Sequence, residues 1–245
     1  MPNAGVSRGV VSYVRRSPRM NPSQRAAMHR LASRYLVAVP HGELETSVSP
    51  QARVDWKTEF GRAVGPDTSE LLVEIGSGTG DALVASALAN PQASLVAFEV
   101  YERAVASTMS KLAAAQVNNV RILMVDGVQG LQVLFEPATI TRLTTFFPDP
   151  WHKKRHHKRR LIQPAFAELV TNRLVADGRW LLATDWADYA EHMRAVLDVA
   201  PGLVNEHQGQ AGWAPRPASR PITRFEQRGI DAGRRVFDLS YRRQA

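Results

Sequence analysis

The sequence contains no cysteine among its 245 residues. Disulfide bonds and thiolate metal sites are therefore excluded. Three of the seven histidines lie in one basic stretch, and the seven lack the paired spacing of metal ligands, so we expect no metal.

Long apolar runs are also missing. No stretch of about 18 uncharged apolar residues occurs, and the N-terminus lacks the apolar core of a signal peptide. We therefore expect a cytoplasmic protein with no membrane partner. With 44% hydrophobic and 22% charged residues, the chain has the composition of a folded protein.

Acidic residues are absent from two segments that are rich in basic ones. Residues 1–40 contain seven arginines and residues 151–160 contain six lysines or arginines, within a chain of formal net charge +8. The remainder has more acidic than basic residues. Clusters of this kind indicate a polyanion that docks at particular places. The alternatives are solvated basic segments or a nuclear-localisation patch.

The chain divides into a short arm and one larger unit. Residues 1–20 show no sustained periodicity, and we interpret them as a flexible basic N-terminal arm. Residues 21–245 are predicted to form a single domain. A helix is predicted from Pro22 to Tyr35, because Asn21 is a good N-cap and Gln24 stands where a capping-box partner would reach back.

From residue 71, short apolar runs alternate with amphipathic stretches, which indicates βαβ units and a parallel sheet. The predicted strands are Leu71–Ile75, Leu95–Glu99, Val120–Val125, Leu143–Phe147, Trp180–Thr184, Leu203–Glu206 and Arg235–Tyr241. The other predicted helices are Val54–Phe60, Asp81–Ala89, Arg103–Gln116, Leu161–Val175 and Ala187–Val199. The last two strands are joined by a long loop. This α/β pattern predicts the doubly wound, seven-stranded Rossmann-like methyltransferase fold, a mostly parallel sheet with an antiparallel last strand.

A glycine-rich turn follows the first predicted strand. Gly76, Gly78 and Gly80 allow a tight turn and a close approach of the backbone to a ligand. In a dinucleotide site the third glycine would stand at Asp81, and the helix N-terminus would hold a pyrophosphate. A carboxylate at that position opposes a bound diphosphate. S-adenosyl-L-methionine carries a sulfonium and no phosphate, so it suits this turn better.

Two acids follow at the ends of the next strands. Glu99 is predicted to accept the ribose hydroxyls of the cofactor, and Asp126 to meet the edge of its adenine. Because ligand crevices lie at the carboxyl ends of parallel strands, these acids and Glu74 are expected to share one site. They resemble the class I methyltransferase pattern. A helix-capping aspartate with a surface glutamate is the alternative.

The fourth predicted strand runs into Pro148, Asp149, Pro150 and Trp151. Two prolines restrict the backbone around Asp149, so its carboxylate is predicted to face the substrate. An acid before a proline and an aromatic residue resembles the motif with which many methyltransferases hold a nitrogen nucleophile. Trp151 either stacks on a base or anchors the core. The six basic side chains between Lys153 and Arg160 are predicted phosphate partners.

Together, these motifs resemble the bacterial tRNA (guanine-7)-methyltransferase family over residues 12–243. The segments that carry the resemblance are Ser12–Arg16, Phe147–Arg155, Thr184–Asp185, Arg220–Glu226 and Asp238–Leu239. The resemblance implies cofactor contact by Glu74, Glu99, Asp126 and Asp149. It implies substrate contact by Lys153, Asp185, Thr223, Arg224, Phe225 and Glu226. Pro18, where the family has glycine, and Arg224, where lysine is usual, depart from the pattern.

The implied reaction is methyl transfer from S-adenosyl-L-methionine to ring nitrogen 7 of a guanine in the variable loop of tRNA. This nitrogen has a free lone pair, so no base has to remove a proton. Asp149 is therefore predicted to orient the guanine and stabilise its developing charge, with assistance from Asp185. The alternatives are methylation of another nucleic-acid nitrogen and a non-catalytic RNA-binding protein on the same fold.

Overall fold

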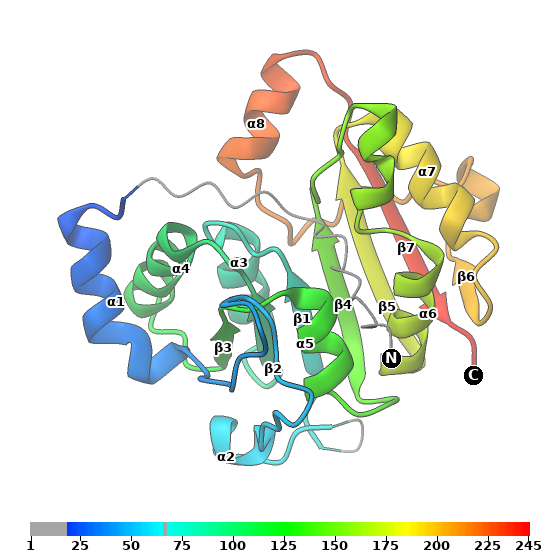
Figure 1. The fold of residues 1–245 in the computed structure, drawn as a ribbon. Helices are drawn as coiled ribbons and strands as arrows, with labels where there is room; N and C mark the ends of the chain where they lie inside the picture. The colour runs from blue at the N-terminus through cyan, green and yellow to red at the C-terminus, as the bar shows by residue number, and fades with distance from the viewer. Residues whose placement is uncertain (1–18, 66–67) are drawn as a thin grey trace, which may run out of the picture.

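The computed structural model describes residues 19–65 and 68–245, so the predicted arm of residues 1–20 lies almost wholly outside the described residues. The strands are β1 (Leu71–Ile75), β2 (Ser94–Phe98), β3 (Val120–Leu123), β4 (Ile140–Phe146), β5 (Leu174–Thr184), β6 (Leu203–Asn205) and β7 (Phe237–Arg243). In the described part of the chain they form one sheet in the order β3-β2-β1-β4-β5-β7-β6 (Figure 1). Strand β7 is antiparallel to β5 and β6, and the other neighbouring strands are parallel. The predicted fold is confirmed.

Most predicted strands lie within a few residues of the observed ones, and β1 has the predicted bounds. Every residue of β1 and β2 is buried, because helices cover both faces of this part of the sheet. Strand β5 begins earlier than predicted. Its first half contains Asp177, whose φ is 60°, and Gly178, and such a pair in the sequence is typical of a turn.

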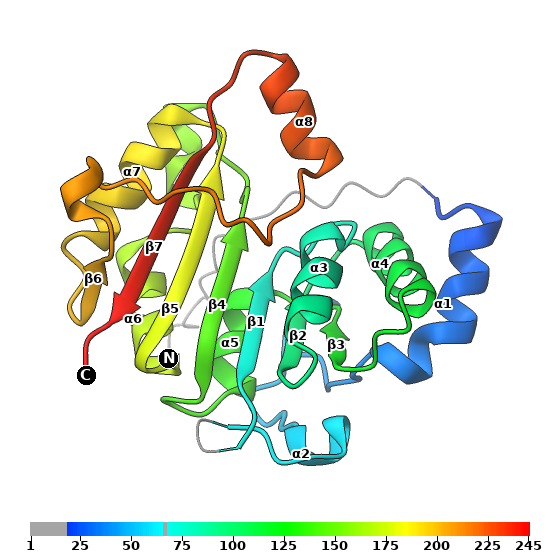
Figure 2. The same ribbon diagram turned by 180° about the vertical axis from the view of Figure 1, so that it is seen from behind.

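Six helices form two layers, one on each face of the sheet (Figures 1 and 2). Helices α1 (Pro22–Tyr35), α3 (Asp81–Ala89) and α4 (Glu102–Ala114) pack on the face that buries Leu72 and Leu95. Helices α5 (Gly127–Leu134), α6 (Pro164–Arg173) and α7 (Ala187–Leu197) pack on the face that buries Val73 and Val96. The short helix α2 (Trp56–Phe60) adds Trp56 to this second core, stacked on Phe135 with ring centroids 5.0 Å apart.

The first helix begins as predicted. The Asn21 side chain accepts the N–H of Gln24 at 2.8 Å, and the Gln24 side chain accepts the N–H of Asn21 at 3.1 Å. These two bonds make the predicted capping box. Gln24 also donates to Ser107 at 3.3 Å, which ties the start of α1 to α4.

Two helices were not predicted. The sequence of α5 contains glycines, which disfavour helix formation. However, a Cβ at Gly130 would lie 2.2 Å from the ring of Phe98, so glycine allows α5 to pack closely on β2. Helix α8 (Arg224–Asp231) lies within the predicted long loop. The connection from β6 to α8 crosses the face of β7, β5 and β4 (Figure 2). Two short 3-10 helices, η1 (Lys154–Arg159) and η2 (Gln208–Gln210), complete the described elements.

The two edges of the sheet differ. At the β3 edge, Val37 donates its N–H to the carbonyl oxygen of Ile122 at 3.0 Å, and Leu36 pairs with Ile122 as an isolated parallel bridge. At the other edge, β6 contains three residues.

None of the helices in residues 19–65 and 68–245 has the length and apolar composition needed to cross a bilayer.

Candidate active site

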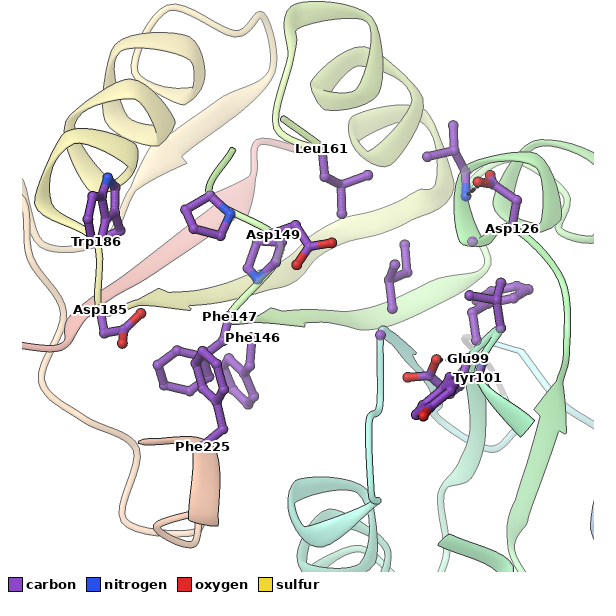
Figure 3. Close-up of a pocket in the computed structure, with 18 of the residues that line it drawn as sticks. Glu99, Tyr101, Asp126, Phe146, Phe147, Asp149, Leu161, Asp185, Trp186 and Phe225 are labelled. Carbon is purple, nitrogen blue, oxygen red and sulfur yellow. Dashed lines mark hydrogen bonds between the residues drawn. The ribbon is translucent and has the colours of Figure 1, made fainter. Parts of the chain in front are cut away.

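A cleft of about 630 Å³ lies at the carboxyl ends of the parallel strands. It lies where β1 and β4 meet and the connections turn to opposite sides of the sheet, which is the usual ligand position in open α/β sheets. Figure 3 shows Glu99 and Asp126 on one side of the cleft, Asp185 on the other, and Asp149 between them. The structure therefore brings together four of the predicted acids.

The glycine turn after β1 adopts the conformation that only glycine adopts without strain. The φ angles of Gly76, Gly78 and Gly80 are 77°, 54° and 81°. Gly76 lines the cleft. A Cβ at Gly80 would lie 2.5 Å from the Thr108 side chain, so glycine also allows α3 to approach α4.

The Glu99 carboxylate is fixed by two backbone groups. It accepts the N–H of Gly78 at 2.8 Å through one oxygen and the N–H of Tyr101 at 2.9 Å through the other. Burial raises the pKa of this carboxyl, the backbone hydrogen bonds oppose that shift, and the nearby charge of Asp149 adds to it. The remaining lone pairs of a carboxylate held in this way can accept hydroxyl groups from a ligand in the cleft.

Asp126 both caps a helix and lines the cleft, while its predicted contact with adenine stays a prediction. One of its oxygens caps α5, accepting the N–H groups of Val128 and Gln129 at 3.0 Å each. The same residue lines the cleft (Figure 3). Burial raises the pKa of its carboxyl, while the two capping bonds lower it. Capping therefore orients the side chain at the cleft.

Glu74 is not among the residues that line the cleft, although it lies in β1 next to Ile75, which does. Its residue exposure is only 7%. Burial raises the pKa of its carboxyl to about 7; nearby Arg142 opposes this shift and Glu99 reinforces it. Its contact with a cofactor remains a prediction.

The charges of the site suit a cationic ligand. Burial raises the pKa of both Glu74 and Glu99, and neighbouring acids add to each shift: Glu99 acts on Glu74, and Asp149 acts on Glu99. Negative charges gathered in this way disfavour one another. A ligand with a positive sulfur and no phosphate would relieve that repulsion. At the start of α3, Asp81 is paired with Lys111 at 2.7 Å, so the helix N-terminus already carries a carboxylate. These residues fit S-adenosyl-L-methionine and oppose a dinucleotide.

Asp149 lies in a sharply bent turn after β4. Phe147 and Trp151, on either side of the Pro148–Pro150 segment, have positive φ angles of 51° and 48°. Such angles cost a non-glycine residue roughly 1–3 kcal/mol and concentrate at functional sites. The side chain of Asp149 is exposed and lines the cleft. The turn therefore presents this carboxylate to a substrate.

An aromatic surface flanks Asp149. The rings of Phe147 and Phe225 lie 5.4 Å apart, and both line the cleft (Figure 3). Phe225 belongs to α8 and is 51% exposed. Beside this surface (Figure 3), Asp185 accepts a hydrogen bond from Arg234 at 2.7 Å, and both residues line the cleft. A flat aromatic ring in the substrate can pack against this surface.

Helix α8 is held in place by buried charges. Glu226 is 1% exposed and pairs with Arg220 at 3.2 Å and with Arg216 at 3.1 Å. Arg220 also donates to both oxygens of Asp238 at 2.9 Å, and its guanidinium lies over the ring of Phe147 at 5.4 Å. This cluster links α8 to β7 and to the end of β4.

The predicted substrate residues of α8 therefore have different surroundings. Thr223 is the N-cap of the helix and accepts the N–H of Glu226 at 3.1 Å. Arg224 is exposed, Phe225 lines the cleft, and Glu226 is buried. Thr223, Arg224, Glu226 and the exposed Lys153 do not line the cleft, and their contact with substrate stays a prediction.

The basic residues form the exposed surface of η1, beside the Asp149 turn. Lys153, Lys154, Arg155, Lys158 and Arg159 are exposed. Trp151 is partly buried and does not line the cleft. The Arg159 guanidinium lies 4.9 Å from the centroid of its ring. Arg160, in contrast, is 2% exposed and bonded within the protein, which corrects the expectation that it meets a phosphate.

Several residues that line the cleft were not found from the sequence. They include Tyr101, His152, Leu161, Trp186 and Arg234. Tyr101 and His152 are near predicted site residues in the chain, so proximity could have indicated them. Arg234 reaches Asp185 from 49 positions away, and no local pattern marks such a contact. Among the described residues, no group of three or more histidines and acids could hold a metal ion.

Two solved structures share the fold at low identity. TrmN from Thermus thermophilus superposes with a TM-score of 0.51 at 15% identity, covering 72% of this chain and 44% of that one. The 16S rRNA methyltransferase KamB gives a TM-score of 0.50 at 14% identity, covering 73% and 89%. The sheet order, the glycine turn and the acidic cleft define an S-adenosylmethionine-dependent methyltransferase with a Rossmann-like fold.

Residues 68–239 match a family model described as "Putative methyltransferase". The tRNA (guanine-N(7)-)-methyltransferase of Cutibacterium acnes is 51% identical over 97% of this chain and 84% of its own length. The protein of the same name from a Nocardioides species is 44% identical over 97% and 88%. The chain belongs to the tRNA (guanine-N(7)-)-methyltransferase family.

Proposed function

We propose that this protein transfers the methyl group of S-adenosyl-L-methionine to ring nitrogen 7 of a guanine in tRNA. The observation that carries the proposal is the place of Asp149, which is exposed in the cleft between Glu99, just after β2, and Asp185, just after β5, and is soon followed by an exposed basic segment. The names of the relatives support the same reaction.

When bound, S-adenosyl-L-methionine supplies an activated methyl group on a positively charged sulfur. On this proposal Glu99 accepts its ribose hydroxyls and Asp126 meets its adenine, while Gly76, Gly78 and Gly80 let the backbone come close. Glu74 and Asp149 complete the acidic surroundings. A carboxylate held by two backbone N–H groups, as Glu99 is, needs little rearrangement to accept a ligand.

Asp149 orients the guanine. Nitrogen 7 carries its own lone pair, so the protein's main task is alignment, which in the best intramolecular models is worth about 7–11 kcal/mol. Transfer of the methyl group places a positive charge on the base, and the carboxylates of Asp149 and Asp185 stabilise it. The exposed ring of Phe225 and the partly buried ring of Phe147 beside it pack against the base.

The tRNA backbone docks on the basic segment. Lys153, Lys154, Arg155, Lys158 and Arg159 offer five exposed positive charges beside the cleft, and phosphates supply the main part of nucleic-acid affinity. Lys153, Thr223 and Arg224 are proposed to support substrate binding from the rim, and the buried Glu226 to support it indirectly by holding α8 in place. A tRNA substrate also supports a cytoplasmic location. We further propose that residues 21–245 form one domain, preceded by a basic arm.

Incubation with labelled S-adenosyl-L-methionine and total tRNA, followed by identification of the modified nucleoside, tests the proposal. We expect 7-methylguanosine. A different methylated nucleoside would support the second candidate, methylation of another nucleic-acid nitrogen, which the Asp149-Pro150-Trp151 motif also allows. Cofactor binding without any product would support a non-catalytic RNA-binding protein.

A further inference from the structure

Arg160 is the last residue of the basic run, yet its environment differs from that of the others. Its residue exposure is 2%, whereas the preceding Arg159 is exposed. A guanidinium is removed from water only at a high cost unless its donors are bonded. The bonds that compensate this burial therefore indicate what the residue does.

The guanidinium of Arg160 joins three parts of the protein. Its Nε donates to the carbonyl oxygen of Pro150 at 3.0 Å. Its Nη2 donates to Asp188, in the first turn of α7, and lies 3.1 Å from Nε2 of His157. The group also lies 4.9 Å from the ring centroid of Tyr189, which is fully buried.

These contacts close the basic segment into a loop. Pro150 directly follows Asp149, and Arg160, ten positions later, follows the end of η1. The Arg160 side chain returns from the end of the segment to its beginning and attaches both to α7. A phosphate that pulls on the exposed side chains between them acts on a segment whose two ends are fixed.

The carbonyl that Arg160 holds belongs to the turn that carries Asp149. Phe147 and Trp151 keep positive φ angles in that turn, and backbone of this kind persists only where the surroundings hold it. The pKa of Asp188 is lowered, chiefly by its hydrogen bond from Arg160, so the carboxylate is charged at neutral pH and remains paired.

We propose that Arg160 is a positioning residue, which fixes the Pro148–Pro150 turn against α7 and so holds Asp149 in the cleft while tRNA occupies the adjoining basic segment. The inference rests on the proposed function, because it concerns the placement of the acid assigned to the guanine. It assigns Arg160 no contact with tRNA, cofactor or reacting atoms.

Arg160→Gln and Arg159→Gln, made in the full chain, form a matched pair of neighbouring charge removals. For Arg160→Gln, single-turnover methylation of saturating tRNA is expected to slow by about 100-fold, the scale of a small misplacement at a reacting centre. Its affinity for S-adenosyl-L-methionine and the salt dependence of its tRNA affinity are expected to stay as in the wild type. For Arg159→Gln, the slope of log affinity against log salt is expected to fall by roughly 0.7–0.9, the value of one lost phosphate contact.

Two further variants separate positioning from simple stability. Arg160→Lys keeps one donor group that reaches Pro150 or Asp188 but not both, so its rate is expected to lie between those of Arg160→Gln and the wild type. Asp188→Asn keeps the bond to Pro150 and is expected to lose less activity than Arg160→Gln. Melting curves show that each variant is folded at the assay temperature, and if Arg160→Gln is not, Arg160→Lys and Asp188→Asn carry the test.

The possible failures are distinguishable. Absence of 7-methylguanosine with the wild-type protein would overturn the proposed function. A wild-type protein that is active, with folded Arg160 variants of equal rate, would overturn only the positioning role. A flattened salt slope in Arg160→Gln with an unchanged rate at saturating tRNA would show that Arg160 is a phosphate contact instead.

Discussion

Glu99 uses one carboxylate for two purposes, since it fixes the glycine turn through Gly78 and faces the cleft that we assign to the cofactor. Loss of this side chain removes ligand contacts and also frees a backbone N–H in the turn. Glu99 contributes little to the apolar core. We therefore expect the loss of its side chain to weaken cofactor binding more than it weakens folding.

Glu99→Ala is expected to weaken S-adenosyl-L-methionine binding by about 10-fold to 100-fold, since a hydrogen bond to a charged group is worth about 1.5–3 kcal/mol. Calorimetric titration measures the affinity. Glu102→Ala is the control, because Glu102 is an exposed acid nearby that does not line the cleft. Unchanged affinity in a folded Glu99→Ala variant would remove Glu99 from the site.

Asp149→Ala is expected to lower turnover by about 100-fold or more, the usual effect of removing one group that stabilises developing charge. Cofactor affinity should fall less, because the carboxylate is assigned chiefly to the guanine. Asp149→Asn keeps the shape of the side chain without its charge, so comparison of the two variants separates orientation from charge stabilisation. Turnover near the wild-type value at saturating tRNA would show that the assignment is wrong.

At the scale of elements, η1 provides exposed charge beside the cleft, and the structure removes one residue from the predicted set. Changing Lys153, Lys154, Arg155, Lys158 and Arg159 together to glutamine, while leaving Arg160 intact, is expected to weaken tRNA binding. The salt slope should fall by roughly 0.7–0.9 for each phosphate contact that is lost. Binding isotherms at several salt concentrations measure both quantities.

Arg179→Gln is the control for this change, since Arg179 is exposed, paired with Glu206, and absent from the cleft lining. Lys153→Gln alone identifies any part of the effect that comes from the residue nearest Asp149 in sequence. If affinity, salt slope and turnover all remain at their wild-type values, the segment is a solvated loop and tRNA docks elsewhere.

The regular elements could be predicted from the sequence because their signals are local. The apolar run of β1 and the capping box at Asn21 are local patterns, and both were found as predicted. Helix α5 was missed because the glycine that permits its packing, Gly130, weakens the helical pattern, and the reason for that glycine lies in β2. Helix α8 was missed although Thr223 and Glu226 have capping-box spacing.

The site divides in the same way. Acids at strand ends were predictable, because strand ends converge in a parallel sheet. The pairing of Asp185 with Arg234 joins residues 49 positions apart. The burial of Glu226 depends on how α8 packs against Arg216 and Arg220, and no local pattern in the sequence marks that packing. The burial of Arg160 was likewise hidden, because in the sequence it continues a run of exposed basic residues.

At the scale of the whole molecule, Glu74 links stability to pH. Burial raises the pKa of its carboxyl from the ordinary value of 4.5 to about 7. Between these values the folded protein retains a proton that the unfolded chain has lost. The contribution of Glu74 to stability is therefore full below pH 4.5 and is lost as the pH rises through about 7.

Glu74→Gln resembles the protonated carboxyl at every pH and is expected to be more stable than the wild type above neutrality. Since one pKa unit corresponds to about 1.4 kcal/mol, the gain at about pH 8 is on the order of 3 kcal/mol at most. It should become small near pH 5, where the wild-type carboxyl is already largely protonated. Denaturant unfolding at the two pH values measures the difference.

Glu70→Gln supplies the control, because Glu70 is exposed immediately before β1. A stability difference between Glu74→Gln and the wild type that is the same at both pH values would show that the carboxyl of Glu74 does not titrate abnormally in the folded protein.

The edges of the sheet have a consequence for how the protein behaves at high concentration. An open strand edge is a template on which another chain can add a strand, and this is a common route to aggregation. Here the β3 edge is met by Leu36 and Val37, and the other edge strand, β6, is only three residues long. Strand addition is therefore disfavoured at both edges, and self-association of the folded protein, where it occurs, should proceed through helices or loops.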